Sequence, residues 1–365
     1  MQRSLILSVV FLAGMAATTF AVAEEKRLNI FSWAGIFDDE TLQGFQKSTG
    51  VTPQYDSFVS DEALETALLT GGSGYDIVTP SASPFLAHEI RAGVLKKLDP
   101  KQIPNLKKLD PALMDLLKTS DAQNEFAIIA AWGTTGLGFN MQKVEERLPG
   151  VSLDSYDVLF KPENAAKLAD CGIAILDSPV DIIPIVLKYL QLDPNSEDPA
   201  DLQKAVDVLN GLRPSLRYID SSKYMNDLAS GEICAVIGWS GDVLTAAQGA
   251  KEADSTARIE YIIPKEGTLV WMTAMAVPAD APHPEAAFAF INHTLDPKVA
   301  AHLAEITGFP SAVPESRQYL SPEMADSPVL FPSPEVMKTL FLGGTSSDAY
   351  VRARTRAWTT FRSGI

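Results

Sequence analysis

The sequence contains little cysteine and little histidine. Among 365 residues there are two cysteines and four histidines, and the histidines are scattered along the chain: His88, His283, His293 and His302. No HExxH or CxxC motif occurs, and no His/Cys cluster has the spacing of a metal site. We therefore expect no metal and no cofactor.

Two short motifs resemble catalytic sequences but lack essential parts. Gly72-Ser73-Gly74 has no lysine and hydroxyl residue of the kind that completes a phosphate-binding loop. In residues 238–241 the second glycine comes one position too early for a nucleophile elbow, and no histidine follows in a suitable place. These absences predict that the chain is not an enzyme.

Basic residues are also few relative to acidic ones. The chain has 30 Lys and Arg against 46 Asp and Glu, a formal net charge of −16. Such a protein repels nucleic acid and anionic lipid and attracts cations, so we expect no nucleic-acid partner. The acidity can also serve solubility alone, so it excludes partners more firmly than it identifies one.

A single long apolar run lies at the N-terminus. Arg3 precedes an apolar stretch over residues 5–20, and a small-x-small sequence, 21–23, comes just before the polar run 24–27. This pattern predicts a signal peptide, residues 1–23, cleaved after Ala23. An uncleaved anchor is the alternative, although the stretch is short for a membrane span. In an oxidising compartment, Cys171 and Cys234 are expected to form a disulfide.

The first part of the mature chain has the pattern of a parallel α/β unit. Residues 27–33 alternate like a half-buried strand, and a helix opened by Asp38 and Asp39 ends at Gly50. A strand at 51–55, a helix at 62–69 and a strand at 75–81 follow. This order predicts βαβ connections and a parallel sheet with covered faces.

A second α/β unit follows the extended segment 132–140. Strands are predicted at 171–177 and 233–238, each followed by a helix, and strand character resumes at 261–264 and 269–278. About 340 mature residues suit two domains, and no long linker separates the units. We therefore expect two interleaved α/β lobes with a ligand cleft between them. The first lobe is 24–135, completed by about 266–310; the second is 136–265, completed by part of 311–365.

Ligands bind α/β sheets outside the carboxyl ends of the strands. Three of the five tryptophans fall at such predicted positions: Trp33, Trp239 and Trp271. They suggest an aromatic box for an apolar or cationic ligand, with Asp181 and Asp242 binding its charge. The alternative is that each tryptophan only caps a lobe.

Many short stretches match one known family in the same order. They are Phe31-Ser32-Trp33, 74–83, 132–138, 161–164, 176–179, 221–229, 237–242, 263–267 and 354–358. In these stretches, and from about Leu28 to Gly364, the chain resembles the periplasmic polyamine-binding proteins of bacterial ABC transporters, in particular the putrescine-binding type. The resemblance implies a monomeric periplasmic binding protein with two hinged α/β lobes. Its partners would be a small cationic amine and an inner-membrane permease.

The resemblance also implies the ligand-binding residues. The family's pocket positions fall on Trp33, Ser83, Asp181, Trp239, Asp242, Trp271, Thr273 and Phe309. The family's cysteine pair falls on Cys171 and Cys234 and supports a disulfide within the second lobe.

The chain departs from the putrescine binders at two acidic positions. Residues 34–36 are Ala-Gly-Ile where the family has Ser-Asp-Tyr, and Thr273 replaces an aspartate. A buried ammonium without its anion costs about 2–5 kcal/mol, so putrescine binds weakly unless neighbouring groups or waters compensate. The ligand is therefore putrescine or a related polyamine, or a monocationic ω-amino acid such as γ-aminobutyrate or 5-aminovalerate. A sensor subunit that loads ligand onto a membrane receptor is the other possible role.

Overall fold

The computed structural model describes residues 26–253 and 257–364, so the predicted signal peptide lies outside the described residues. The chain packs around two hydrophobic cores. One contains buried side chains from Leu28 to Trp132 and from Val270 to Leu342. The other extends from Leu137 to Leu269 and takes in C-terminal side chains as far as Phe361. The cores thus change over between Trp132 and Leu137, which supports the predicted lobe limits; these limits remain a prediction.

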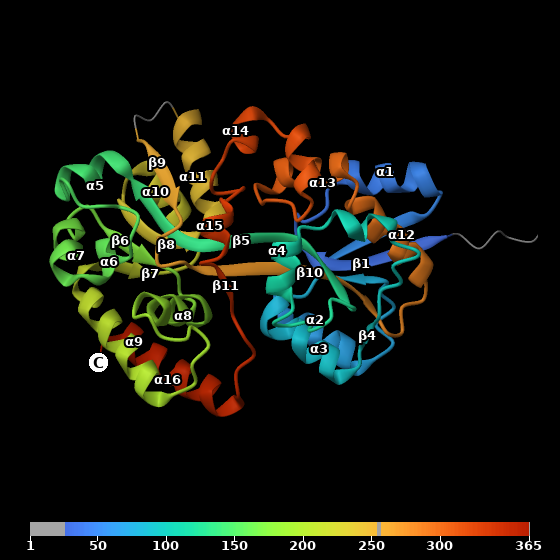
Figure 1. The fold of residues 1–365 in the computed structure, drawn as a ribbon, viewed down its shortest axis with the longest axis horizontal. Coiled ribbons are helices and arrows are strands. Elements are labelled where there is room, and N and C mark those ends of the chain that lie inside the picture. The colour runs from blue at the N-terminus through green and yellow to red at the C-terminus, as the bar shows by residue number, and fades with distance from the viewer. Residues whose placement is uncertain (1–25, 254–256, 365) are drawn as a thin grey trace, which may run out of the picture.

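The strands form one sheet that runs through both lobes (Figure 1). They are β1 Arg27–Trp33, β2 Thr52–Phe58, β3 Ile77–Val78, β4 Leu95–Lys96, β5 Ala127–Asn140, β6 Ile173–Ile175, β7 Leu216–Ile219, β8 Ala235–Trp239, β9 Ile259–Ile262, β10 Leu269–Pro278 and β11 Phe341–Leu342. Their order is β2-β1-β3-β10-β5-β8-β6-β7, with β4 and β11 paired to β10 and β9 paired to β5.

Helices cover the sheet in both lobes (Figure 1). They are α1 Asp39–Thr49, α2 Asp61–Thr70, α3 Ala87–Ala92, α4 Pro111–Leu117, α5 Met141–Arg147, α6 Asp157–Phe160, α7 Pro162–Leu168, α8 Pro179–Tyr189, α9 Pro199–Leu212, α10 Tyr224–Ser230, α11 Ser240–Glu252, α12 Pro284–Thr294, α13 Pro297–Thr307, α14 Pro322–Ala325, α15 Pro334–Met337 and α16 Asp348–Ser363. Short turns, η1 Ala82–Leu86, η2 Pro104–Lys108, η3 Arg213–Ser215 and η4 Pro314–Tyr319, complete the list.

The sheet is mixed, which corrects the expectation of a parallel one. Within each lobe the predicted βαβ strands do pair in parallel, β1 with β2 and β3, and β6 with β7 and β8. The strands that join the lobes, β5 and β10, run antiparallel to each other and to their outer neighbours β8 and β3. Figure 1 shows β5 and β10 crossing from one lobe to the other.

Local signals account for the first βα unit. Asp38 caps α1 by accepting the Thr41 backbone N–H at 3.0 Å, and Gly50 ends the helix at φ 72°, a conformation that favours glycine. By contrast, β3 is much shorter than the predicted 75–81. Asp76, the residue before β3, is buried and accepts the backbone N–H groups of Asn29 and His283. Its side chain therefore links β1 to the start of α12.

The predicted disulfide is confirmed. Cys171 and Cys234 are bonded, with 5.5 Å between their Cα atoms, and lie just before the parallel strands β6 and β8. Both belong to the second core, so the bond joins two buried strands of one lobe.

Replacing both Cys171 and Cys234 with alanine should destabilise the protein without changing its ligand affinity. The bond closes a loop with a sequence separation of 63, for which loop-closure entropy gives about 4 kcal/mol. Urea unfolding measures this loss, and calorimetry of bound amine serves as the control. Unchanged stability would contradict a structural role for the disulfide.

Candidate functional site in the interlobe cleft

A cleft of about 720 Å³ is lined by side chains from both lobes. The first lobe contributes residues from α2 and η1, the second contributes residues from α8, α11 and α16, and β10 passes between them. Of the predicted site residues, the cleft brings together Ser83, Asp181, Trp239, Asp242, Trp271, Thr273 and Phe309. Their roles in binding remain a prediction.

Asp181 lies at the start of α8, where the strand before it places its carboxylate in the cleft. Oδ1 accepts the Thr135 hydroxyl at 2.9 Å and the Trp239 indole N–H at 3.4 Å, and Oδ2 accepts the Ser178 hydroxyl. Burial raises the pKa of Asp181, while these three hydrogen bonds oppose the rise. The carboxylate is thus held in a fixed orientation but is poorly compensated electrostatically.

Asp242 lies in the first turn of α11 and is held by a buried tyrosine. The Tyr224 hydroxyl donates to Asp242 Oδ2 at 2.7 Å and accepts the Trp239 backbone N–H at 3.2 Å. Burial raises the pKa of Asp242, and the bond from Tyr224 partly offsets this rise. A Cβ on Gly238 would lie 2.7 Å from the Tyr224 ring, so glycine is needed for the tyrosine to reach the carboxylate.

Three aromatic rings line the same cleft as these carboxylates. Trp271 and Phe309 pack edge to face with 4.8 Å between ring centroids, and Trp239 directs its N–H at Asp181. A Cβ on Gly133 would collide with the Trp271 ring, so the glycine lets the indole approach β5 closely. Aromatic faces beside anions suit an aliphatic ammonium, whose methylenes and charge both find a partner.

Two tryptophans differ from the expected positions. Trp271 is the third residue of β10, inside the strand, which corrects its predicted place at a strand end. Trp33 does end β1 but is not among the described residues that line the cleft. It is half-buried and packs edge-on against Phe58, with 4.6 Å between centroids.

The two positions where acids were expected have different environments. Thr273 lines the cleft and is 8% exposed. Gly35 has φ 80°, which makes an aspartate there strained, and Ile36 is buried in the first core. Ser83 lines the cleft, and its hydroxyl donates to the Gly344 carbonyl at 3.3 Å.

This chain is similar to several known proteins. A family model for bacterial extracellular solute-binding proteins matches residues 40–332. The chain is 41% identical to the putrescine-binding periplasmic protein SpuD of Pseudomonas aeruginosa, covering 97% of this chain and 96% of that protein. It is also 41% identical to the putrescine-binding periplasmic protein PotF of Escherichia coli, covering 94% and 93%.

A solved structure extends the likeness to the fold. The spermidine/putrescine ABC transporter substrate-binding protein PotD from Streptococcus pneumoniae superposes with a TM-score of 0.81 at 25% identity, covering 93% of this chain and 99% of that one. This chain belongs to the bacterial extracellular solute-binding proteins. The resemblance and the two-lobed α/β fold inferred from the sequence are thereby confirmed. Within residues 26–253 and 257–364, no helix is long and apolar enough to cross a membrane.

The cleft of this solute-binding protein has residues that the sequence did not single out. Asp61, Glu62 and Glu65 line it from α2, and His88 lines it from α3. Arg354 lines it from α16. The α2 acids follow Ser60, an N-cap, at helical spacing, so they are typical of a solvated helix start and carry no signal of a cleft.

Glu89 lies behind this acidic side of the cleft. Its side chain is fully buried, and neither carboxyl oxygen has a hydrogen-bond partner in the structure. Burial, with smaller effects of the charges on Asp61 and Glu65, raises the pKa of Glu89 to about 8. A buried acid without a partner is costly, so this residue needs a reason to be there.

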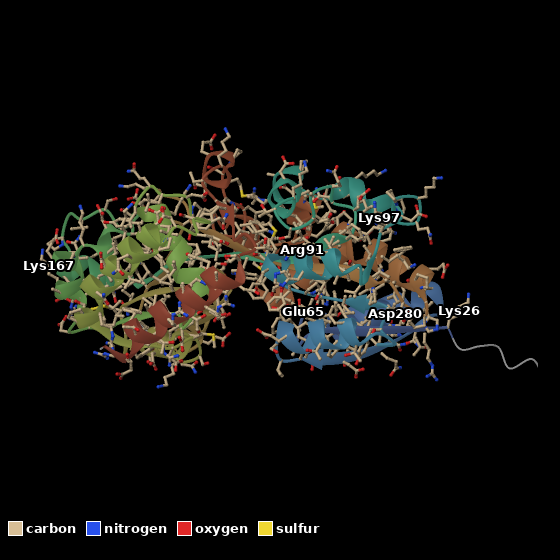
Figure 2. All side chains as sticks on the ribbon, turned by 90° about the horizontal axis from the view of Figure 1, so that it is seen from below. Lys26, Glu65, Arg91, Lys97, Lys167 and Asp280 are labelled. Carbon is tan, nitrogen blue, oxygen red and sulfur yellow. A yellow bond between two sulfur atoms is a disulfide. The ribbon has the colours of Figure 1, made fainter. Side chains whose placement is uncertain are left out.

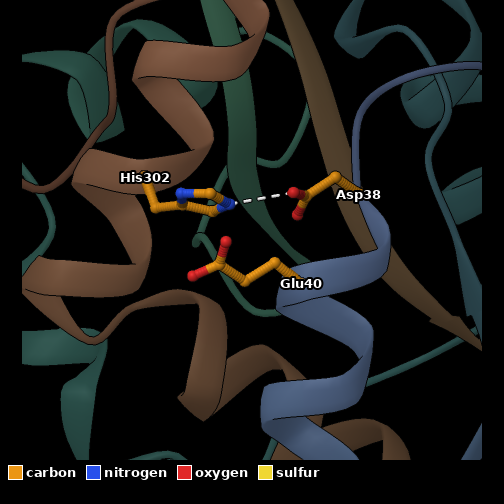
Figure 3. Close-up of side chains that lie close together, drawn as sticks. All are labelled: Asp38, Glu40 and His302. Atoms are coloured by element: carbon orange, nitrogen blue, oxygen red, sulfur yellow. Dashed lines mark hydrogen bonds and ion pairs between the residues drawn. The ribbon is translucent and has the colours of Figure 1, made fainter.

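A second cluster, away from the cleft residues, has the composition of a cation site. Ligand atoms of Asp38, Glu40 and His302 lie within 4.8 Å of one another (Figure 3). His302 Nε2 is 2.9 Å from Asp38, which is already the N-cap of α1. Asp38 and His302 therefore link α1 to α13.

The stability of the wild type relative to Glu89→Gln should fall as pH rises from about 4.5 to about 8. Across this window the unfolded chain ionises Glu89 while the folded protein keeps it protonated, at a cost of up to about 1.4 kcal/mol per pH unit. Below this window the difference should be constant, and above it constant again. Urea unfolding at a series of pH values measures it, with the exposed Glu163→Gln as control. A flat difference would show that the folded protein ionises Glu89 normally.

Proposed function

We propose that this protein is the periplasmic substrate-binding protein of an ABC transporter and captures putrescine or a related aliphatic amine in its cleft. The main observation behind this proposal is that one cleft between the lobes brings together two carboxylates, the buried Asp181 and the half-buried Asp242, and the rings of Trp239 and Trp271. The printed names of SpuD and PotF, both putrescine-binding periplasmic proteins, support the amine as ligand.

The groups in the cleft divide the work of recognition. An ammonium of the ligand would donate charge-assisted hydrogen bonds to the carboxylates of Asp242 and Asp181, which would restore the pKa of each toward its usual range. The aromatic rings would cover the methylenes and add cation–π attraction. Closure of the lobes would remove water and strengthen these interactions.

The location and partners follow from the same role. We propose that residues 1–23 are removed after Ala23 and that the monomeric mature protein works in the periplasm with an inner-membrane permease. The relatives are substrate-binding transport proteins, which supports a binding role without catalysis.

One observation favours a second ligand class, the ω-amino acids. Arg354 lines the cleft, and burial lowers its pKa. Its guanidinium lies 5.6 Å from the centroid of the Tyr350 ring, and no ion pair of Arg354 is recorded among the described residues. A ligand such as γ-aminobutyrate would place its ammonium at Asp242 and its carboxylate toward this arginine.

A thermal-shift panel decides between these ligands. Putrescine, cadaverine, spermidine, γ-aminobutyrate and 5-aminovalerate are added to the mature protein at equal concentration. A ligand at 100 times its Kd stabilises the folded state by about 2.7 kcal/mol, so the preferred class should stand out. We expect the diamines to give the largest shifts. No shift with any amine would overturn the proposed function.

Asp242→Ala should weaken putrescine binding far more than Ser83→Ala. The aspartate supplies a desolvated charge, and its loss should cost about 2–5 kcal/mol. The Ser83 hydroxyl already donates to Gly344, and its loss should cost about 1 kcal/mol or less. Isothermal calorimetry measures both, with Asp242→Asn separating charge from shape. Equal losses would remove Asp242 as the ammonium anchor.

Trp239→Ala should reduce amine affinity by about 1–2 kcal/mol and leave the ligand-free protein nearly as stable. The matched control is Trp132→Ala, because Trp132 is 3% exposed inside the first core and its loss should cost about 3–5 kcal/mol of stability. Melting temperatures and calorimetry of the two variants are compared. A larger stability loss for Trp239→Ala would indicate a core role instead.

A further inference from the structure

The acidic wall of the first lobe consists of Asp61 and Glu65 on α2, with Glu89 of α3 behind them. Asp61 and Glu65 line the cleft, whereas Asp181 and Asp242 line it from the second lobe. Figure 2 shows Glu65 on the part of the first lobe that is nearest the second. The cleft therefore has carboxylates on both sides.

Asp61 occupies the neighbourhood in which an expected carboxylate is missing. Its Oδ1 accepts the Ser81 backbone N–H at 2.8 Å, and Ser81 forms a β-bridge with Thr273. Asp61, Ser81 and Thr273 all line the cleft. The Asp61 carboxylate is thus connected through Ser81 to Thr273, the position at which the family resemblance implies an aspartate.

Glu89 is the independent sign that this wall receives a cation. It is fully buried, and neither carboxyl oxygen has a hydrogen-bond partner. The charges on Asp61 and Glu65 are close enough to contribute to its raised pKa. A buried carboxyl without a partner is costly, and a cation held by the neighbouring carboxylates of Asp61 and Glu65 would lower that cost. Within the described residues, these three acids form one ion pair, a long contact of 3.5 Å between Glu65 and His88 Nδ1.

We propose that the acidic wall binds the second ammonium of an aliphatic diamine whose first ammonium is held by Asp181 and Asp242. This inference rests on the proposed amine-binding function and names its substrate class. Asp61 and Glu65 would contact the ammonium, and Glu89, which has no exposed atom, would act on it through them as a positioning residue. The wall would replace the carboxylates absent at Gly35 and Thr273.

The experiment compares ligands that differ by one ammonium. Calorimetry gives the Kd of putrescine and n-butylamine, and of cadaverine and n-pentylamine, for the wild type, Asp61→Asn and Glu65→Gln. Asparagine keeps the oxygen that accepts the Ser81 N–H, so the wall retains its shape. Each substitution should weaken the diamines about tenfold or more and change the monoamines less than about twofold. The exposed Glu163→Gln, in the second lobe, controls for net charge.

Glu89→Gln adds a readout that a purely structural residue would not give. It should weaken diamine binding, leave monoamine binding unchanged, and raise or preserve the melting temperature of the ligand-free protein. A merely structural acid would lose stability, or would affect both ligand types equally.

The possible outcomes distinguish a failure of the acidic-wall proposal from a failure of the proposed function. Equal effects on diamines and monoamines, or no preference of the wild type for either diamine, would overturn the acidic wall while leaving amine binding intact. Binding of none of the four amines would overturn the proposed function and the wall with it.

Discussion

The antiparallel pairing of β5 with β10 is the constraint on which the rest of the structure depends. These strands run through both lobes, and their register places Trp271 opposite Gly133 and Thr273 opposite Ala131. The second half of β5 pairs with β8, which places Trp239 opposite Thr135. These two ladders of backbone hydrogen bonds on β5 therefore fix Trp271 and Trp239 and the residues opposite them. Because β5 also joins the two cores, a shift of its register would displace both sides of the cleft together.

The cleft residues are held by contacts that leave their charges incompletely satisfied. Asp181 receives hydroxyl and indole donors and Asp242 receives one tyrosine hydroxyl, yet burial still raises both pKa values. The supporting groups, Thr135 and Tyr224, are themselves buried, so the carboxylates cannot readily turn to solvent. A carboxylate that is rigidly held and poorly solvated is well prepared to bind a cation, because binding then costs little further conformational entropy.

Sequence alone predicted the elements whose signals are local. Asp38 and Gly50 define α1 to within a residue, and Asp181 and Asp242 stand out because each follows a strand at a helix start. The antiparallel direction of β10 was not predictable, because strand pairing depends on contacts distant in sequence. Asp61 and Glu65 were missed for a related reason. Their helix has the pattern of an ordinary solvated surface, and only the packing of α2 beside the cleft makes its acids candidates for ligand binding.

The placement of acids on both sides of the cleft connects ligand binding to closure. Asp61 and Glu89 belong to the first lobe and have raised pKa values because they are buried; Asp181 and Asp242 belong to the second and are raised for the same reason. With no cation present, bringing these groups together in a drier cleft would increase their repulsion and desolvation. A diamine would make closure favourable instead, because each ammonium would neutralise the acids on one side of the cleft. A monoamine would neutralise only one, so the same charges that attract amines would favour closure most strongly around a dication.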